Sequence, residues 1–275
     1  MNIARAIDLY LDALTHARAA LRTPTVLVPF ALFAILQGLI LVALASFMSP
    51  FVAPVMVPVM RFLGGEQSLH YPLHLVGLPS VYQRVYLPLV ATLGFALWTF
   101  AVWMLVDRHS VGMERPRRPF GPALAHVILI GVLFVGASVI MGEAASRLTG
   151  PRTPALLARA IFLASVAVTV IAQTFLVYAP VVLRLRGGTA WGALRTSVNY
   201  ARRHFLATAL LILTVLVAHM PLDVLLARAD RIAARFHPEA VLQVMFASIA
   251  LEMFTAYLLF AGVTQLALPR EGGLK

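Results

Sequence analysis

One carboxylic acid, Glu252, lies in the middle of a long uncharged stretch bounded by Glu239 and Arg270. A charge inside the hydrocarbon of a membrane costs several kcal/mol, so such a side chain must be neutral, paired or turned toward a wet cavity. It could carry a proton or a cation, or contact a substrate. The alternative is a neutral acid that hydrogen-bonds inside a helix bundle. We expect Glu252 to face the bundle interior in its protonated form.

Three other polar side chains lie inside apolar stretches and are the candidate partners of Glu252: Gln37, His126 and Gln173. Polar side chains at such depth commonly form hydrogen bonds between membrane helices. We interpret both glutamines in this way. Histidine can also carry a proton near neutral pH, but we favour a hydrogen-bonding role for His126.

A possible metal site is suggested by Glu66, His70 and His74, whose four-residue spacing would gather three ligands on one helical face. Pro72 interrupts such a helix, so we predict an external loop without a metal. Before this loop, prolines recur at every fourth position, at Pro50, Pro54 and Pro58. We expect the segment 49–84 to contain a kinked or re-entrant apolar piece, or a docking surface for another membrane protein.

The remaining chemistry in the sequence is sparse. His219 and Asp223 flank Pro221 near the outer end of an apolar stretch. There they could join Glu66, His70 and His74 in one external polar cluster. The chain has no cysteine, which excludes disulfides and thiolate metal sites. We find no Ser-His-Asp order, paired-carboxylate site or cofactor fingerprint. The sequence therefore predicts no enzymatic activity and no cofactor.

The elements that position these side chains are apolar helices. Hydrophobic residues make up 61% of the chain, and no charged residue occurs in the 38 positions from Thr23 to Met60. About 20 apolar residues cross a bilayer as a helix. Six spans are predicted, at about 26–48, 85–106, 120–142, 160–183, 205–227 and 240–267. We predict an all-α polytopic membrane protein, with six transmembrane helices in three hairpins that form a single membrane domain over 1–275.

Two further segments have helical apolar spacing and a charged face, 3–22 and 189–204. Such amphipathic helices lie in the membrane interface, where arginines contact lipid headgroups. We predict headgroup contacts for five arginines: Arg18, Arg22, Arg195, Arg202 and Arg203. The simpler alternative is that both helices only set the depth and tilt of the spans that follow.

The second of these segments carries a family resemblance. It reads Thr-Ala-Trp-Gly-Ala-Leu-Arg-Thr-Ser-Val-Asn-Tyr-Ala-Arg-Arg-His-Phe over 189–205 and leads straight into a span. This stretch resembles the basic elbow of an uncharacterised family of bacterial six-span inner-membrane proteins, which includes the membrane domain of some glycerophosphodiester phosphodiesterases. The resemblance covers about 25 residues, 189–213. It implies an all-helical inner-membrane protein with a connection to lipids, and the phosphodiesterase domain has no counterpart here.

The net charge of +11 indicates which partners to expect. The cations lie between apolar runs, so anionic lipid headgroups are better partners than nucleic acid. Loops on the side of the termini hold 14 of the 22 Lys and Arg residues, and the opposite loops hold 8. Basic loops stay cytoplasmic. We therefore expect both termini in the cytoplasm of a bacterial cell, with the protein in its inner membrane.

Two functions fit the sequence. The first is a non-enzymatic scaffold or accessory subunit that binds lipids or other integral membrane proteins, which suits the short loops and the few polar residues inside spans. The second is a transporter or lipid-handling permease that uses Glu252 as its coupling group. The surroundings of Glu252 discriminate between them, because a water-accessible cavity favours transport and a dry contact favours a scaffold. From the sequence alone we favour the scaffold.

Overall fold

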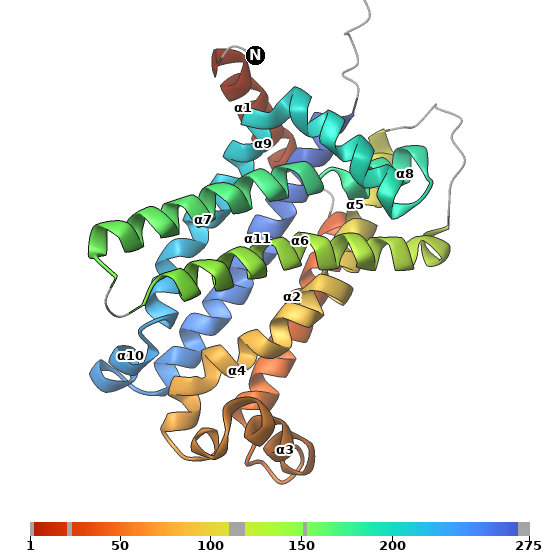
Figure 1. Cartoon of the computed structure of the whole chain (residues 1–275). Coiled ribbons are helices and arrows are strands. Elements are labelled where there is room, and N and C mark those ends of the chain that lie inside the picture. Colours follow the sequence, from red (N-terminus) through yellow and green to blue (C-terminus); the bar gives the residue numbers. More distant parts are fainter. Residues whose placement is uncertain (1–2, 21–23, 110–118, 151–152, 269–275) are drawn as a thin grey trace, which may run out of the picture. The chain divides into compact units, whose positions relative to one another are not determined.

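The computed structural model describes residues 3–20, 24–109, 119–150 and 153–268. Within these residues the chain is helical and contains no strand, which confirms the predicted all-α class (Figure 1). Six helical segments are long and apolar enough to cross a membrane: Thr25–Ala45, Leu73–Arg108, Phe120–Leu148, Ala155–Arg186, Ala190–Leu226 and Glu239–Ala267. The chain is therefore an integral, polytopic membrane protein.

The helices follow one another with short connections. Their bounds are α1 (Ile3–Ala20), α2 (Pro24–Ala45), α3 (Ala53–Gly64), the short 3₁₀ helix η1 (Glu66–Leu69), α4 (Leu73–Leu89), the π-helical segment η2 (Val90–Gly94), α5 (Phe95–His109), α6 (Phe120–Leu148), α7 (Ala155–Leu176), α8 (Ala179–Arg186), α9 (Ala190–Leu226), α10 (Ala229–Arg235) and α11 (Glu239–Ala267). The interfacial position predicted for α1 stays a prediction.

Two parts of the chain differ from the sequence-based expectation. The second membrane-spanning helical segment begins at Leu73, well before the predicted start at 85. The region 49–84 is mostly helical rather than an open loop. Pro54 lies in the first turn of α3, where a missing backbone N–H costs nothing. The predicted helix 189–204 and the following span are joined in α9, with a kink at His204 (φ −119°, ψ 22°). The predicted boundary at 204 is thus a bend rather than a break.

The chain divides into two compact units. The first unit comprises residues 1–29, 90–214 and 257–275, and the second comprises residues 30–89 and 215–256. Several helices contribute residues to both units, since α2, α9 and α11 each cross a boundary. The single membrane domain inferred from the sequence stays a prediction.

The second unit packs around an apolar cluster contributed by all of its helices. Its buried members are Leu41, Leu44, Phe47, Met60, Leu75, Leu78, Val81, Ala229, Ile232, Val241, Met245 and Ile249. Because α3 contributes Met60 to this cluster, the proline-rich segment is part of the fold rather than a free loop. The cluster holds α2, α4 and α11 together in this unit and so positions their polar faces.

The first unit packs around aromatic rings and one close helix contact. Phe95 meets Phe260 edge to face and Phe134 lies tilted against it, with ring centroids 5.9 and 6.4 Å away. Gly131 on α6 lies against the π-helical segment, where a Cβ atom would collide with the carbonyl oxygen of Ala91. Glycine is therefore required for this approach, and α6 then continues into a hairpin with α7.

An ion pair and a tryptophan fix α8 against α5 in the first unit. Arg184 donates through Nε and Nη2 to both oxygens of Asp107, at 2.8 and 2.6 Å. Its guanidinium lies over the ring of Trp103, 4.9 Å from the centroid, and the Trp103 indole donates to the Pro180 carbonyl. A forked, stacked arginine of this kind is a stronger link than a surface ion pair.

Candidate functional site

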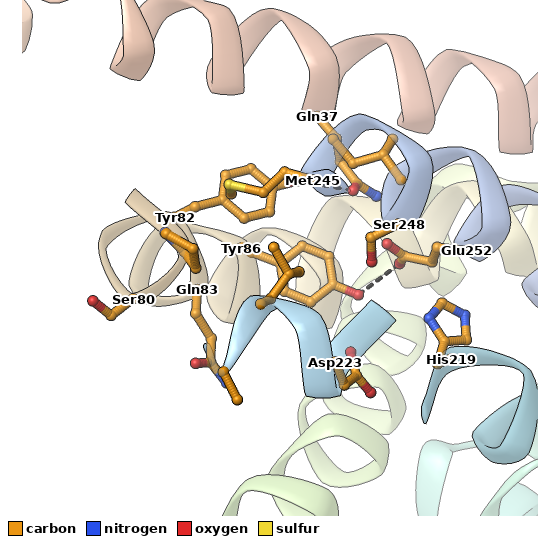
Figure 2. Close-up of a pocket in the computed structure, with 14 residues that line it drawn as sticks. Gln37, Ser80, Tyr82, Gln83, Tyr86, His219, Asp223, Met245, Ser248 and Glu252 are labelled. Atoms are coloured by element: carbon orange, nitrogen blue, oxygen red, sulfur yellow. Dashed lines mark hydrogen bonds between the residues drawn. The ribbon is translucent and has the colours of Figure 1, made fainter. Parts of the chain in front are cut away.

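Glu252 is held by a neutral hydrogen-bond donor from another helix. The Tyr86 hydroxyl of α4 donates to Oε1 of Glu252 on α11, at 2.6 Å (Figure 2). The side-chain amide of Gln37 on α2 interacts with the same carboxyl. A carboxyl group offers about four lone-pair sites, so these neighbours leave room for a further partner.

The carboxyl of Glu252 lies on the wall of a cavity of about 540 Å³ in the second unit. Fourteen residues line it: Gln37, Pro79, Ser80, Tyr82, Gln83, Tyr86, His219, Asp223, Leu226, Ala227, Met245, Ser248, Ile249 and Glu252. The cavity opens at the surface of the second unit, and Glu252 is half-buried. The surroundings of this acid are therefore an open cavity with polar and apolar walls rather than a closed helix contact.

Helical spacing explains why these side chains converge. Tyr82 and Tyr86 are four residues apart on α4, so both occupy the same face, and their rings stack with centroids 5.8 Å apart. Tyr82 donates to Oε1 of Gln37, at 2.9 Å, which ties α4 to α2. On α11 the same spacing places Ser248 one turn before Glu252. Each helix thus presents a narrow polar stripe on an otherwise apolar surface.

His219 and Asp223 form the third polar stripe, on α9 beside the Tyr86–Glu252 pair (Figure 2). His219 Nε2 lies 2.9 Å from the Thr255 hydroxyl, which itself donates to the Leu251 carbonyl. A hydroxyl has one proton to donate, so Thr255 accepts from His219 in this arrangement. The imidazole is thereby oriented beside the cavity, with Asp223 one turn away.

The charge of the cavity wall is one-sided. Two carboxylic acids, Glu252 and Asp223, line it together with one imidazole, and none of the described lining residues is an arginine or a lysine. Hydroxyl and amide groups complete the polar part of the wall. Such a site suits a proton or a positively charged ligand, because nothing in the wall would compensate a negative one.

The structure places the predicted partners of Glu252 in different surroundings. Gln37 lines the cavity and is almost completely buried, with 1% of its surface exposed. His126 and Gln173 belong to the first unit, where Gln173 donates to the Ser138 hydroxyl at 2.8 Å between α7 and α6. Of the three candidates, only Gln37 is brought to Glu252 within the second unit.

The structure places Glu66 and His74 in different surroundings. Glu66 pairs with Arg61, while His74 is buried against the rings of Phe47 and Tyr71. Within the described residues, no three His, Cys, Asp or Glu side chains are grouped as metal ligands. His219 and Asp223, which we considered as possible members of an external polar cluster, line the cavity with Glu252. Their depth depends on how α9 packs, which a single sequence does not reveal.

The predicted headgroup contacts are also distributed unevenly. Arg18, Arg195, Arg202 and Arg203 are exposed on α1 and α9, and Arg22 lies outside the described residues. Arg203 lines a separate basic pocket in the first unit. Two cavity residues, Tyr82 and Tyr86, received no role from the sequence, although their four-residue spacing on an apolar helix was a usable signal.

Comparisons of the chain with protein-family models, curated proteins and solved structures find no match. The resemblance to the family of six-span inner-membrane proteins therefore stays a prediction. Any functional conclusion must come from the chemistry of the site itself.

Proposed function

We propose that this membrane protein is a transporter or permease in which Glu252 binds either a proton or a small organic cation. The observation that supports this proposal is the cavity of about 540 Å³ on whose wall Glu252 lies. Pockets for small molecules typically span about 300–1,000 Å³. The sequence alone favoured a scaffold, but an open cavity at Glu252 supports a transporter.

The wall of the cavity determines the class of substrate. Glu252 and Asp223 supply negative charge, and the rings of Tyr82 and Tyr86 supply aromatic surface. Aromatic faces attract ammonium groups, and alkylated ammonium ions are favoured by such sites. A phosphate or carboxylate substrate would instead face two acids without an arginine or lysine. We therefore assign the cavity to an amine or a quaternary ammonium ion.

If Glu252 binds either a proton or a cation but not both, transport of the cation is coupled to movement of the proton. An ionised Glu252 without a counter-charge is unfavourable inside an apolar bundle, so the group gains from binding either a proton or a cation. The two occupants compete for the same oxygens. Entry of the cation would then release the proton, which is the elementary step of cation–proton exchange.

Carbodiimide labelling of the reconstituted protein tests this proposal. Dicyclohexylcarbodiimide reacts with protonated carboxyl groups in apolar surroundings, and labelled residues are identified by mass spectrometry. We expect tetramethylammonium to slow labelling of Glu252, because the cation displaces the proton. Glu143 is the control, since it is exposed on α6 and paired with Arg147. Labelling of Glu252 that is unchanged by tetramethylammonium would contradict the proposal, and equal protection by sodium would contradict an organic substrate.

A scaffold is the second candidate, and one observation favours it. No residue of the most apolar 18-residue stretch in the fourth span, Ala155–Arg186, is buried inside the chain. This surface is available to lipid or to another membrane protein. A scaffold needs no ligand at Glu252, so in that case no cation should change the labelling rate. Its partner proteins should instead copurify with the intact protein.

A further inference from the structure

A second cavity, in the first unit, has the opposite charge. It has a volume of about 500 Å³ and is lined by α1, α8, α9 and the end of α11. Three of its side chains are arginines from three different helices: Arg5, Arg186 and Arg203. Tyr200, His204 and Asp12 are the other titratable groups in the wall. We call this cavity the basic pocket.

The three arginines of the basic pocket outnumber its one acid, Asp12. Among the residues that the structure describes, the ion pairs involve other groups, and none of them includes Arg5, Arg186 or Arg203. Asp12 is already engaged by His16, whose Nδ1 lies 3.3 Å from the carboxylate. Three cations thus face one acid that has its own partner, which leaves the pocket with excess positive charge.

Local structure fixes where these arginines lie. Arg186 ends α8, and Gly187 and Gly188 follow with positive φ angles of 67° and 94°, a conformation that favours glycine. The chain then turns into α9, whose kink at His204 immediately follows Arg203. The pocket is therefore built by a turn and a bend rather than by one continuous helix surface.

The remaining walls are held by contacts within the first unit. Tyr257 on α11 donates to the Ala17 carbonyl of α1, at 2.6 Å. The absence of a side chain at Gly262 lets Leu211 of α9 and Ala13 of α1 approach α11. These contacts bring α1, α9 and α11 together, so the spacing between Arg5 and Arg203 is set by packed helices.

The position of the pocket along the chain places it at membrane-headgroup depth. Arg186 is the last residue of one candidate span and Ala267 is the last residue of another, while α1 precedes the first span. With six spans, these ends all lie on the same side of the membrane. Arginines at the ends of spans reach the layer of phosphate groups.

We propose that the basic pocket binds a phosphate group, and that its source is the headgroup of an anionic lipid. Arginine presents a planar fork that matches two phosphate oxygens, which distinguishes it from the point charge of lysine. The Tyr200 hydroxyl supplies a further donor at the wall. This site is independent of the function proposed for the Glu252 cavity.

Native mass spectrometry of the intact protein in detergent tests the site. Phosphatidylglycerol and zwitterionic phosphatidylcholine are the probes, and the pocket variant is R186Q/R203Q. The control is R195Q/R202Q, which removes two exposed arginines of α9 that do not line the pocket. We expect the wild type and the control to retain phosphatidylglycerol preferentially. The pocket variant should retain it roughly 30-fold less, or about 2 kcal/mol at 1.4 kcal/mol per tenfold.

The other outcomes are also informative. Equal loss in the pocket variant and the control, or equal retention of both lipids by the wild type, would overturn the proposal. Thermal stabilisation of the wild type, but not of the pocket variant, by inorganic phosphate without any preference for phosphatidylglycerol would support the phosphate site and reject the lipid source. If R186Q/R203Q does not fold, R186K/R203K replaces it. That variant keeps both charges but loses the forks, so retention equal to the wild type would overturn forked binding.

Discussion

Removing the hydrogen bond between Tyr86 and Glu252 should reveal how the carboxyl is held. The tyrosine hydroxyl of α4 donates to Oε1 of Glu252 on α11, at 2.6 Å. Glu252→Gln keeps the side-chain shape and an acceptor, so we expect its stability to be close to that of the wild type. Glu252→Leu leaves the Tyr86 hydroxyl without this acceptor. We expect it to lower the unfolding free energy by roughly 1–2 kcal/mol.

A double-mutant cycle isolates the bond itself. Tyr86→Phe removes the donor, and interhelical hydrogen bonds in membrane proteins average about 0.6 kcal/mol with a maximum near 1.7 kcal/mol. The double variant Y86F/E252L has no unpaired hydroxyl, so its loss should be smaller than the sum of the single losses by roughly 1 kcal/mol. Unfolding in mixed micelles, followed by far-ultraviolet circular dichroism, measures all four free energies.

The cycle has a matched control and a clear failure. Combining Tyr86→Phe with Glu143→Leu should give additive losses, because Glu143 is exposed on α6 and pairs with Arg147. Additivity for independent sites holds to about 0.3–0.5 kcal/mol. If the losses of Y86F and E252L also add within that range, the two side chains do not interact and the geometry described for the cavity is incorrect.

Three further outcomes follow from the remaining structure. Cysteine at Gln67 should be labelled by an impermeant thiol reagent in intact cells and cysteine at Thr189 should not; the reverse pattern would refute the predicted orientation. Gly131→Ala should lower the melting temperature, since its Cβ would meet the Ala91 carbonyl and relief of such overlap costs about 1–3 kcal/mol. Arg184→Lys should destabilise the protein by roughly 1–3 kcal/mol because the fork and the ring contact are lost, and unchanged melting would show that charge alone suffices.

Much of the fold was predictable because hydropathy alone determines which segments can cross a membrane. Hydropathy predicts the six apolar helices, and it makes the acid Glu252 stand out inside one of them. The segment 49–84 was harder, since its prolines indicated a kinked or re-entrant piece, or a docking surface, rather than a packed helix. Pro54 falls in the first turn of α3, where proline is compatible with a helix, so the composition of the segment did not determine its structure.

The partners of Glu252 were only partly predictable. Gln37 stood out because it is polar within an apolar run, whereas Tyr86 did not, because tyrosine is common in apolar helices. His219 and Asp223 were recognised as a pair, but their position beside Glu252 was not predicted. Their place beside Glu252 depends on the packing of α9 in the second unit, and long-range packing is not encoded in local spacing.

Asp107 and Glu252, two acids within membrane-spanning segments, have different hydrogen-bond partners, and this difference bears on function. The chain has 22 Lys and Arg residues against 11 Asp and Glu residues, so a basic partner for a structural carboxyl is abundant. Asp107 has one, in the forked contact with Arg184. Glu252 has a tyrosine hydroxyl and an amide instead, on a cavity wall without any arginine. A purely structural acid would gain most from the arginine, whereas an acid with neutral neighbours stays available to a proton or a ligand that enters from the cavity.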